Sequence, residues 1–239
     1  MTHSVQARRF VTQGTLATLL LGTTLTFNAL AQNWPAKPIR VVVPFPAGGG
    51  TDLIAREVGN KVVTNTKWTF IYDNKPGSGG NIGVDAIAKA APDGLNLVIG
   101  QTSNLAINPS LYSKLPYDPS KDLTPIVNIG SSPVVFVVAT NSPYKTFGEL
   151  LAAAKAQPDA INYASSGSGT VAHLATELMQ KEAGVRMTHI PYKGAAQGLT
   201  DVIGGNVQVY VSSVPTLIGH IKSGKLRALA VTSAKRTDD

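Results

Sequence analysis

The chain has 239 residues, 21 lysines and arginines against 14 acidic residues, and no cysteine. The lack of thiols excludes disulfides, cysteine-bound zinc and a thiol nucleophile, so the core alone must stabilise the fold. The net charge of +7 suits an anionic ligand, although a basic surface without a specific role explains it equally well. No stripe of basic and aromatic residues is present, so we expect no nucleic-acid partner.

The first 31 residues have the pattern of an export signal. Arg8 and Arg9 give a positive start, residues 16–25 are mostly apolar, and Ala29-Leu30-Ala31 is a small-residue cleavage site. The apolar run is short for a membrane span, and no later segment is both long and apolar enough. We therefore expect a periplasmic mature protein, exported by ordinary secretion, with the twin-arginine route as the alternative.

Beyond the signal, apolar β-branched runs alternate with segments of helical periodicity. The expected strands cover residues 39–43, 68–72, 95–99, 134–139, 161–163, 207–212 and 226–232. The expected helices cover residues 51–63, 82–90, 146–156, 170–183, 195–203 and 215–223. This alternation is typical of an α/β protein with a mostly parallel sheet covered by helices.

Three strand and helix units precede residues 130–133, and a second set follows them. We therefore expect a first lobe at residues 32–131 and a second at residues 132–232, with residues 233–239 beginning a return to the first. Because the chain stops just after an apolar strand, we expect it to be incomplete at its C-terminus.

Local signals fix some helix ends. Thr146 and Glu149 form a capping box, and Gly184 is a C-terminal glycine cap. Within the helix over residues 170–183, one face carries the expected core contacts Val171, Leu174, Ala175, Leu178 and Met179.

A glycine-rich turn at residues 48–50 separates the first strand from the first helix. Glycines permit positive φ and close approach of a ligand, and a helix N-terminus offers unpaired N–H groups and a positive dipole end. The segment is either an anion-binding cradle or a tight turn, and Thr51 or Asp52 is the expected helix cap. Its candidate ligand contacts are Phe45, Ala47, Gly48, Gly49, Thr51 and Asp52.

A second such arrangement precedes the helix at residues 170–183. Its candidate ligand contacts are Ser165, Ser166, Gly167, Ser168, Gly169, Thr170 and His173. His173 either touches the ligand or reads pH, or it is a structural histidine. With Glu177 four residues on it makes only two metal-ligating groups, too few to indicate a metal site.

Three other segments end strands or precede helices. Their candidate contacts are Gly79 and Gly80, then Thr102 and Ser103, and finally Lys193, Gly194 and Ala195. Each segment has a plain alternative as a turn, a polar loop or a solvated lysine. The chain has no Gly-x-Ser-x-Gly elbow, phosphate-binding loop or histidine cluster, so we expect no catalytic residue and no cofactor.

A set of motifs covers nearly all of the chain beyond the signal. They include WPAKPIR (residues 34–40), VPFPAGGGTD (43–52), DNKPGSGGNIG (73–83), NYAS (162–165), PYKGA (191–195) and GKLRALAVTSAKR (224–236). Together they resemble the Bug-type receptors, the extracytoplasmic solute-binding components of tripartite tricarboxylate transporters.

This resemblance implies a two-lobe Venus-flytrap fold, of the type II periplasmic-binding-protein class. It implies a ligand carboxylate held largely by backbone amides and ordered waters from two loops, matched here by residues 45–52 and 165–170. Many relatives carry an Asp or Asn pair where this chain has Ser212 and Ser213, which favours a plain carboxylate over an amino acid.

The resulting hypothesis is a monomeric receptor that delivers a small mono- or dicarboxylate to membrane permease subunits. The alternatives are a ligand-loaded receptor for a membrane sensor kinase and, third, an enzyme.

Overall fold

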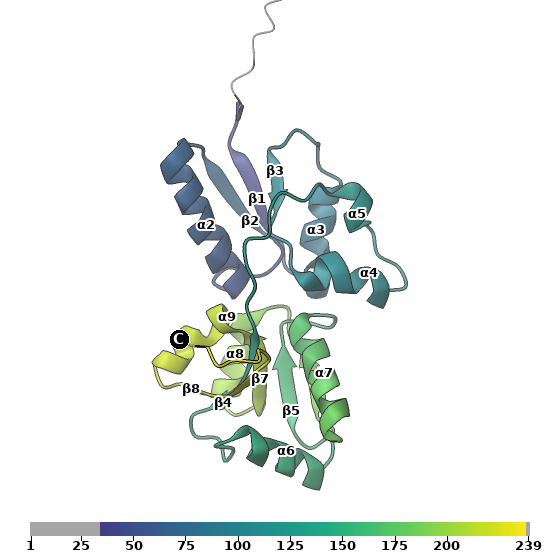
Figure 1. Ribbon diagram of the computed structural model, residues 1–239, viewed down its shortest axis with the longest axis vertical. Coiled ribbons are helices and arrows are strands. Elements are labelled where there is room, and N and C mark those ends of the chain that lie inside the picture. The colour runs from purple at the N-terminus through teal and green to yellow at the C-terminus, as the bar shows by residue number, and fades with distance from the viewer. Residues whose placement is uncertain (1–33, 238–239) are drawn as a thin grey trace, which may run out of the picture. The chain divides into compact units, whose positions relative to one another are not determined.

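The computed structural model describes residues 34–237, so the expected export signal at residues 1–31 lies outside the described residues. Within that range the strands form two separate sheets, each packed against helices (Figure 1). None of the helices in the described range is long and apolar enough to cross a membrane.

The first sheet is parallel, with the strand order β2-β1-β3. Its strands are β1 (Ile39–Val43), β2 (Phe70–Asn74) and β3 (Asn96–Val98), joined by α2 (Gly50–Thr66) and α3 (Asn81–Ala88). The connections from β1 to β2 and from β2 to β3 cross the sheet in opposite directions, so right-handed crossovers place α2 and α3 on opposite faces (Figure 1). The loops after β1 and β3 therefore meet at a switch point, where open α/β sheets bind ligands.

Four short helical turns follow β2 and β3. They are η1 (Ser78–Gly80), η2 (Ser103–Ile107), α4 (Asn108–Leu111) and α5 (Pro119–Asp122). None of them was expected from the sequence, because each is short and lies in a segment rich in glycine, proline, serine and asparagine, whose residues favour turns. A long extended segment then leads to the second sheet.

The second sheet has the order β6-β5-β7-β4-β8. Its strands are β4 (Val134–Ala139), β5 (Asn162–Ser165), β6 (Thr188–Pro191), β7 (Val209–Ser213) and β8 (Leu226–Val231). The helices are α6 (Phe147–Ala156), α7 (Val171–Ala183), α8 (Ala195–Ile203) and α9 (Val214–Lys222). The capping box of α6 and the glycine cap of α7 are confirmed.

Helices cover both faces of this sheet. On one face, α6 and α7 pack against Phe136, Tyr163 and Val211. On the other, α8 and α9 pack against Val137 and Tyr210. Every residue of β4 is buried, as expected for a strand with helices on both sides.

Three expectations about this sheet need correction. The sheet is mixed rather than mostly parallel, because β4 runs antiparallel to both β7 and β8. The strand list omitted β6, a short edge strand whose residues are all at least partly exposed. In α7 the expected Ala175 and Met179 do pack against the core, but the buried residues are Ala172, Thr176 and Gln180, and Leu178 is 60% exposed.

Candidate functional site

A small pocket lies where the loops after parallel strands of both sheets come together. Its volume is about 190 Å³. The lining comes from the loops that follow β1, β2, β5 and β6, together with the end of α4. The lining residues are Phe45, Gly77, Ser78, Gly79, Gly80, Tyr112, Ser166, Gly167, Ser168, Pro191, Tyr192 and Lys193.

The polar groups of the pocket suit an anion. Lys193 is the one charged side chain in the lining, and it forms no ion pair with any residue in the range 34–237. The backbone N–H groups of Ser78, Gly79, Ser166 and Ser168 also lack a partner within that range. Unpaired backbone N–H groups beside a lysine, with no carboxylate in the lining, suit the binding of an anion.

Two tyrosines form walls of the pocket and have their hydroxyls engaged. The Tyr112 hydroxyl donates to the backbone oxygen of Ser168 over 3.3 Å. The Tyr192 hydroxyl donates to Asp201 over 2.5 Å, and burial together with this carboxylate raises the pKa of Tyr192 to about 12. The rings therefore present mainly apolar surface to the pocket.

Glycine is required where the two pocket loops meet. Gly79 has a φ of +63°, and a Cβ there would lie 2.9 Å from the backbone oxygen of Ser168. Gly167 has a φ of +129°, and a Cβ there would approach the Gly79 nitrogen to 3.6 Å. A side chain at either position would strain the backbone, and at Gly79 it would also push the loops apart.

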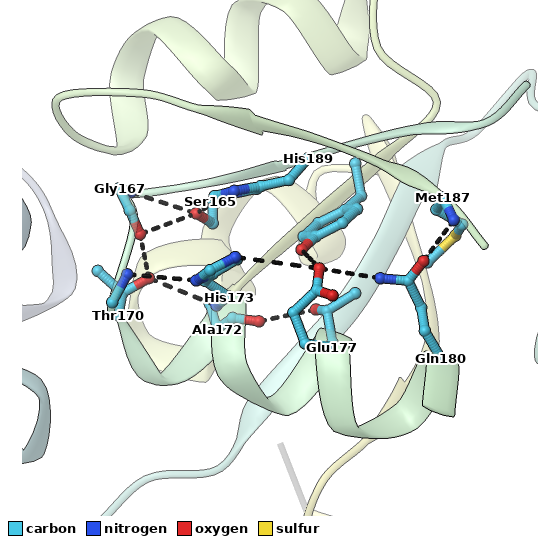
Figure 2. Close-up of polar contacts among 12 residues, drawn as sticks. Ser165, Gly167, Thr170, Ala172, His173, Glu177, Gln180, Met187 and His189 are labelled. Carbon is cyan, nitrogen blue, oxygen red and sulfur yellow. Dashed lines mark hydrogen bonds and ion pairs between the residues drawn. The ribbon is translucent and has the colours of Figure 1, made fainter. Parts of the chain in front are cut away.

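The loop at residues 165–170 is shaped by contacts behind the pocket wall (Figure 2). The buried Ser165 hydroxyl donates to the Gly167 oxygen and accepts from the Gly167 nitrogen, both over 3.2 Å. The Thr170 hydroxyl donates to the same oxygen over 2.7 Å, and the Gly169 N–H donates to Nδ1 of His173 over 3.2 Å. These side chains hold the loop, while Ser166 and Ser168 face the pocket.

Two backbone amides of the glycine-rich turn after β1 are already hydrogen-bonded to side chains of the protein. Gly48 N–H donates to Asp52 Oδ2 over 2.9 Å, and Gly50 N–H donates to Thr216 Oγ1 over 3.1 Å. The N-cap of α2 is Gly49, without a side-chain cap, so the expectation that Thr51 or Asp52 caps the helix is wrong. The Asp52 side chain instead reaches back and closes the turn.

Asp52 is 2% exposed and has three partners in this turn. Besides Gly48, it accepts from Arg56 Nε and from Asn74 Nδ2, each over 3.0 Å. Burial alone would raise the pKa of the Asp52 carboxyl, but the hydrogen bonds from Arg56, Gly48 and Asn74 outweigh burial and lower it. The carboxylate is therefore ionised and structural, and it fixes the loop that carries Phe45.

Side chains of the loop after β3 are also hydrogen-bonded within the protein. Gln101 Nε2 donates to the Thr51 hydroxyl, and the Ser103 hydroxyl donates to Gln101 Oε1 over 3.4 Å. Thr102 is exposed and lies away from the pocket. The hydroxyls in this part of the chain therefore connect two loops of the first sheet.

A buried cluster of asparagine side chains and one tyrosine lies next to the turn that carries Gly79. Asn108 Nδ2 donates to Asn81 Oδ1 over 2.6 Å, and the Tyr117 hydroxyl lies 2.9 Å from the same oxygen. The Tyr117 hydroxyl also lies 2.7 Å from the Asn104 backbone oxygen. Burial raises the pKa of Tyr117 to about 12, so its hydroxyl stays neutral. The cluster joins α4 to the start of α3, directly after the turn that carries Gly79.

Of the candidate ligand contacts, the pocket brings together Phe45, Gly79, Gly80, Ser166, Gly167, Ser168 and Lys193. The candidates outside its lining are Ala47, Gly48, Gly49, Thr51, Asp52, Thr102, Ser103, Ser165, Gly169, Thr170, His173, Gly194 and Ala195. The lining residues not singled out from the sequence are Gly77, Ser78, Tyr112, Pro191 and Tyr192. Gly77, Ser78, Pro191 and Tyr192 lie within the motifs at residues 73–83 and 191–195, next to the residues chosen as contacts, whereas Tyr112 lies in neither motif.

Comparison with known proteins places these features in a family. Residues 54–239 match the family model described as the tripartite tricarboxylate transporter family receptor. Protein BugT of Bordetella pertussis is 38% identical over 208 residues, which cover 87% of this chain and 64% of the relative. A Pseudomonas protein encoded in a tcbD-tcbE intergenic region is 37% identical, covering 85% of this chain and 60% of the relative. The chain thus spans under two thirds of the length of these curated relatives.

Solved structures agree with this assignment. One described as a periplasmic transporter has a TM-score of 0.82 and 38% identity, covering 86% of this chain and 69% of its own. An R. palustris protein solved with adipate has a TM-score of 0.82 and 35% identity. The match covers 85% of this chain and 68% of the R. palustris chain. These matches confirm the two-lobe periplasmic-binding-protein fold. The chain belongs to the tripartite tricarboxylate transporter family of receptors, the Bug-type family.

Proposed function

We propose that this protein is a periplasmic receptor that binds a small mono- or dicarboxylate and delivers it to a tripartite membrane transporter. The observation that carries the proposal is the composition of the pocket. It combines backbone N–H groups that have no partner among residues 34–237, those of Ser78, Gly79, Ser166 and Ser168 among them, with one lysine and no carboxylate in its lining. Among relatives, an R. palustris protein was solved with adipate and MatC of Rhodopseudomonas palustris with malate.

The available donors are sufficient for useful affinity. A hydrogen bond to a charged group contributes about 1.5–3 kcal/mol net. Four N–H groups therefore offer about 6–12 kcal/mol, compared with about 8 kcal/mol for a micromolar complex. Contact with the aromatic walls and with Lys193 offsets the cost of association.

The pocket volume limits the size of the ligand. The pocket has a volume of about 190 Å³. Pockets for drug-sized ligands have volumes of about 300–1,000 Å³. The volume therefore favours a short aliphatic acid. The single lysine fits a second carboxylate at the far end of a dicarboxylate.

A calorimetric panel tests the proposal on the full chain. We expect acetate, succinate, malate and adipate to include at least one binder. The matched control is hexane-1,6-diol, which has the length of adipate without its charges and should not bind. Binding of the diol as tightly as adipate, or of no carboxylate in a broad panel, would refute an anion site.

Delivery to a permease is a separate part of the proposal. The sensor-kinase alternative uses the same pocket, so ligand binding does not separate the two. Uptake of a labelled ligand into proteoliposomes that contain the permease subunits should depend on the added receptor. Uptake that is independent of the receptor would refute the transport role and leave the sensory one.

A further inference from the structure

A cluster of titratable side chains lies directly behind the pocket loop at residues 165–170. It contains Tyr163 from β5. Figure 2 labels its other members, His189 from β6 and His173 and Glu177 from α7. None of these four lines the pocket. Tyr163 is fully buried, and the two histidines are partly buried. The cluster therefore acts on a ligand only through the loop that it supports.

The three rings form a continuous stack. The centroids of His173 and His189 are 4.1 Å apart with an interplanar angle of 18°. His189 stacks in turn on Tyr163, with centroids 4.8 Å apart and an angle of 23°. Two imidazoles this close cannot both carry a positive charge without strong repulsion.

Both imidazoles hold the loop by hydrogen bonds. His173 Nδ1 accepts the N–H of Gly169 over 3.2 Å. His189 Nε2 lies 2.7 Å from the hydroxyl of Ser165, which in turn bonds Gly167. The contact with Gly169 is sensitive to protonation, because the nitrogen must offer a lone pair to accept the N–H. Neutral His173 therefore carries its proton on Nε2, and a proton on Nδ1 would set two donors face to face.

The surroundings favour the neutral rings at neutral pH. In the described part of the chain, the charged or titratable groups facing the two rings are Glu177 and Tyr163. Glu177 Oε1 lies 3.9 Å from His173 Nε2, and it already accepts the Tyr163 hydroxyl and Gln180 Nε2. Burial lowers the pKa of His173, with Glu177 opposing the shift. Burial and the neighbouring His173 lower the pKa of His189 to about 4.

We propose that His173 is a proton-sensitive positioning residue for the ligand loop. The loop keeps its binding shape while Nδ1 of His173 accepts the Gly169 N–H, and protonation of that nitrogen releases Gly169 and weakens ligand binding. The inference rests on the proposed function of the pocket. Loss of one such hydrogen bond corresponds to about three- to tenfold in affinity.

The first test needs no ligand and no variant. In the full chain, NMR follows the His173 ring and the Gly169 amide from about pH 7.5 to about pH 4, because burial lowers the pKa of His173 below the ordinary histidine value of about 6.5. We expect the two signals to change with one midpoint, and the hydrogen-exchange protection of Gly169 to fall on acidification. An amide that keeps its protection while His173 becomes protonated would overturn the proposal.

A pair of variants separates protonation from structure. In His173→Asn the amide oxygen can take the place of Nδ1 as acceptor, but it does not titrate. We expect this variant to lose the acid-induced change at Gly169. The matched control is His220→Asn on α9, away from the loop. It should show the same acid-induced change at Gly169 as the wild type. An identical pH response in wild type and His173→Asn would contradict the assignment.

Calorimetry with adipate then links the loop to the pocket. Because the ligand's own carboxyls titrate in the same range, wild type and His173→Asn are compared at each pH. We expect the affinity ratio of the two proteins to change about three- to tenfold between the two pH values. A constant ratio despite binding would overturn the link to affinity. If adipate binds neither protein at any pH, the ligand assignment fails, while the Gly169 measurement still decides the role of His173.

Discussion

Replacing Asp52 by asparagine tests how the turn after β1 is held. The carboxylate has a donor on each oxygen: Asn74 Nδ2 faces Oδ1, and Gly48 N–H and Arg56 Nε face Oδ2. Asparagine keeps the shape but turns one oxygen into a donor. Asn74 cannot simply flip in response, because its amide also donates to the Phe45 oxygen. In Asp52→Asn, one donor therefore faces another in a buried site.

The expected cost follows from these contacts. A buried donor left unsatisfied costs about 1–3 kcal/mol, and a hydrogen bond to a charged group contributes about 1.5–3 kcal/mol. The Arg56 side chain is 43% exposed, so its ion pair is screened and adds little. We expect Asp52→Asn to lower the free energy of unfolding by about 2–3 kcal/mol, or Tm by roughly 4–12 °C.

Urea unfolding followed by circular dichroism measures this difference. The matched control is Asp159→Asn, which removes an exposed partner that lies 2.6 Å from Arg186. It should change stability by less than about 1 kcal/mol. Because the folded pKa of Asp52 is lowered, its stabilisation is complete above the unfolded value of about 3.9 and is lost at lower pH. Equal effects of the two substitutions would refute the structural role given to Asp52.

Three further outcomes are expected. Lys193→Met should weaken adipate binding about five- to tenfold in calorimetry, and an unchanged Kd would mean that the ammonium stays solvated. Gly79→Ala should lower both Tm and affinity, because its Cβ would meet the Ser168 oxygen at 2.9 Å, whereas Gly219→Ala in open space should stabilise α9 by up to about 1 kcal/mol. The free energy of unfolding should fall as pH drops from about 6.5 toward about 4, because the buried histidines bind protons more weakly in the folded chain than in the unfolded one. A flat profile in denaturant titrations over this range would contradict the last prediction.

The sequence predicted the elements that depend on local sequence alone. The strand Ile39–Val43 and the strand Val134–Ala139 are continuous apolar runs, and both have the predicted bounds. The cap of α6 needs only Thr146 and Glu149, which are close in sequence. The antiparallel orientation of β4 could not be predicted from the sequence. Burial on both faces determines the composition of a strand but not its orientation.

The candidate site was predictable only as far as its loops. The glycine and serine motifs indicated the loops after β2 and β5, and both line the pocket. Which groups in a loop remain free depends on partners far away in sequence. Gly50 donates to Thr216, 166 residues on, and that pairing has no sequence signal. The same holds for Tyr112, whose place at the pocket depends on the bond from Asn108 of α4 to Asn81, 27 residues earlier.

The reversed direction of β4 has a mechanical consequence. Val134 begins β4 beside Ser213 at the end of β7, and β8 ends beside it at Val231. The chain thus enters and leaves this sheet at one edge, where Thr232 N–H donates to the Val134 oxygen over 3.0 Å. The segment from the first sheet and the end of β8 therefore lie on the same side of this sheet as the loops that line the pocket. A change of backbone angles at residues 123–133 would move Lys193 relative to Phe45 while the strands of both sheets stay intact.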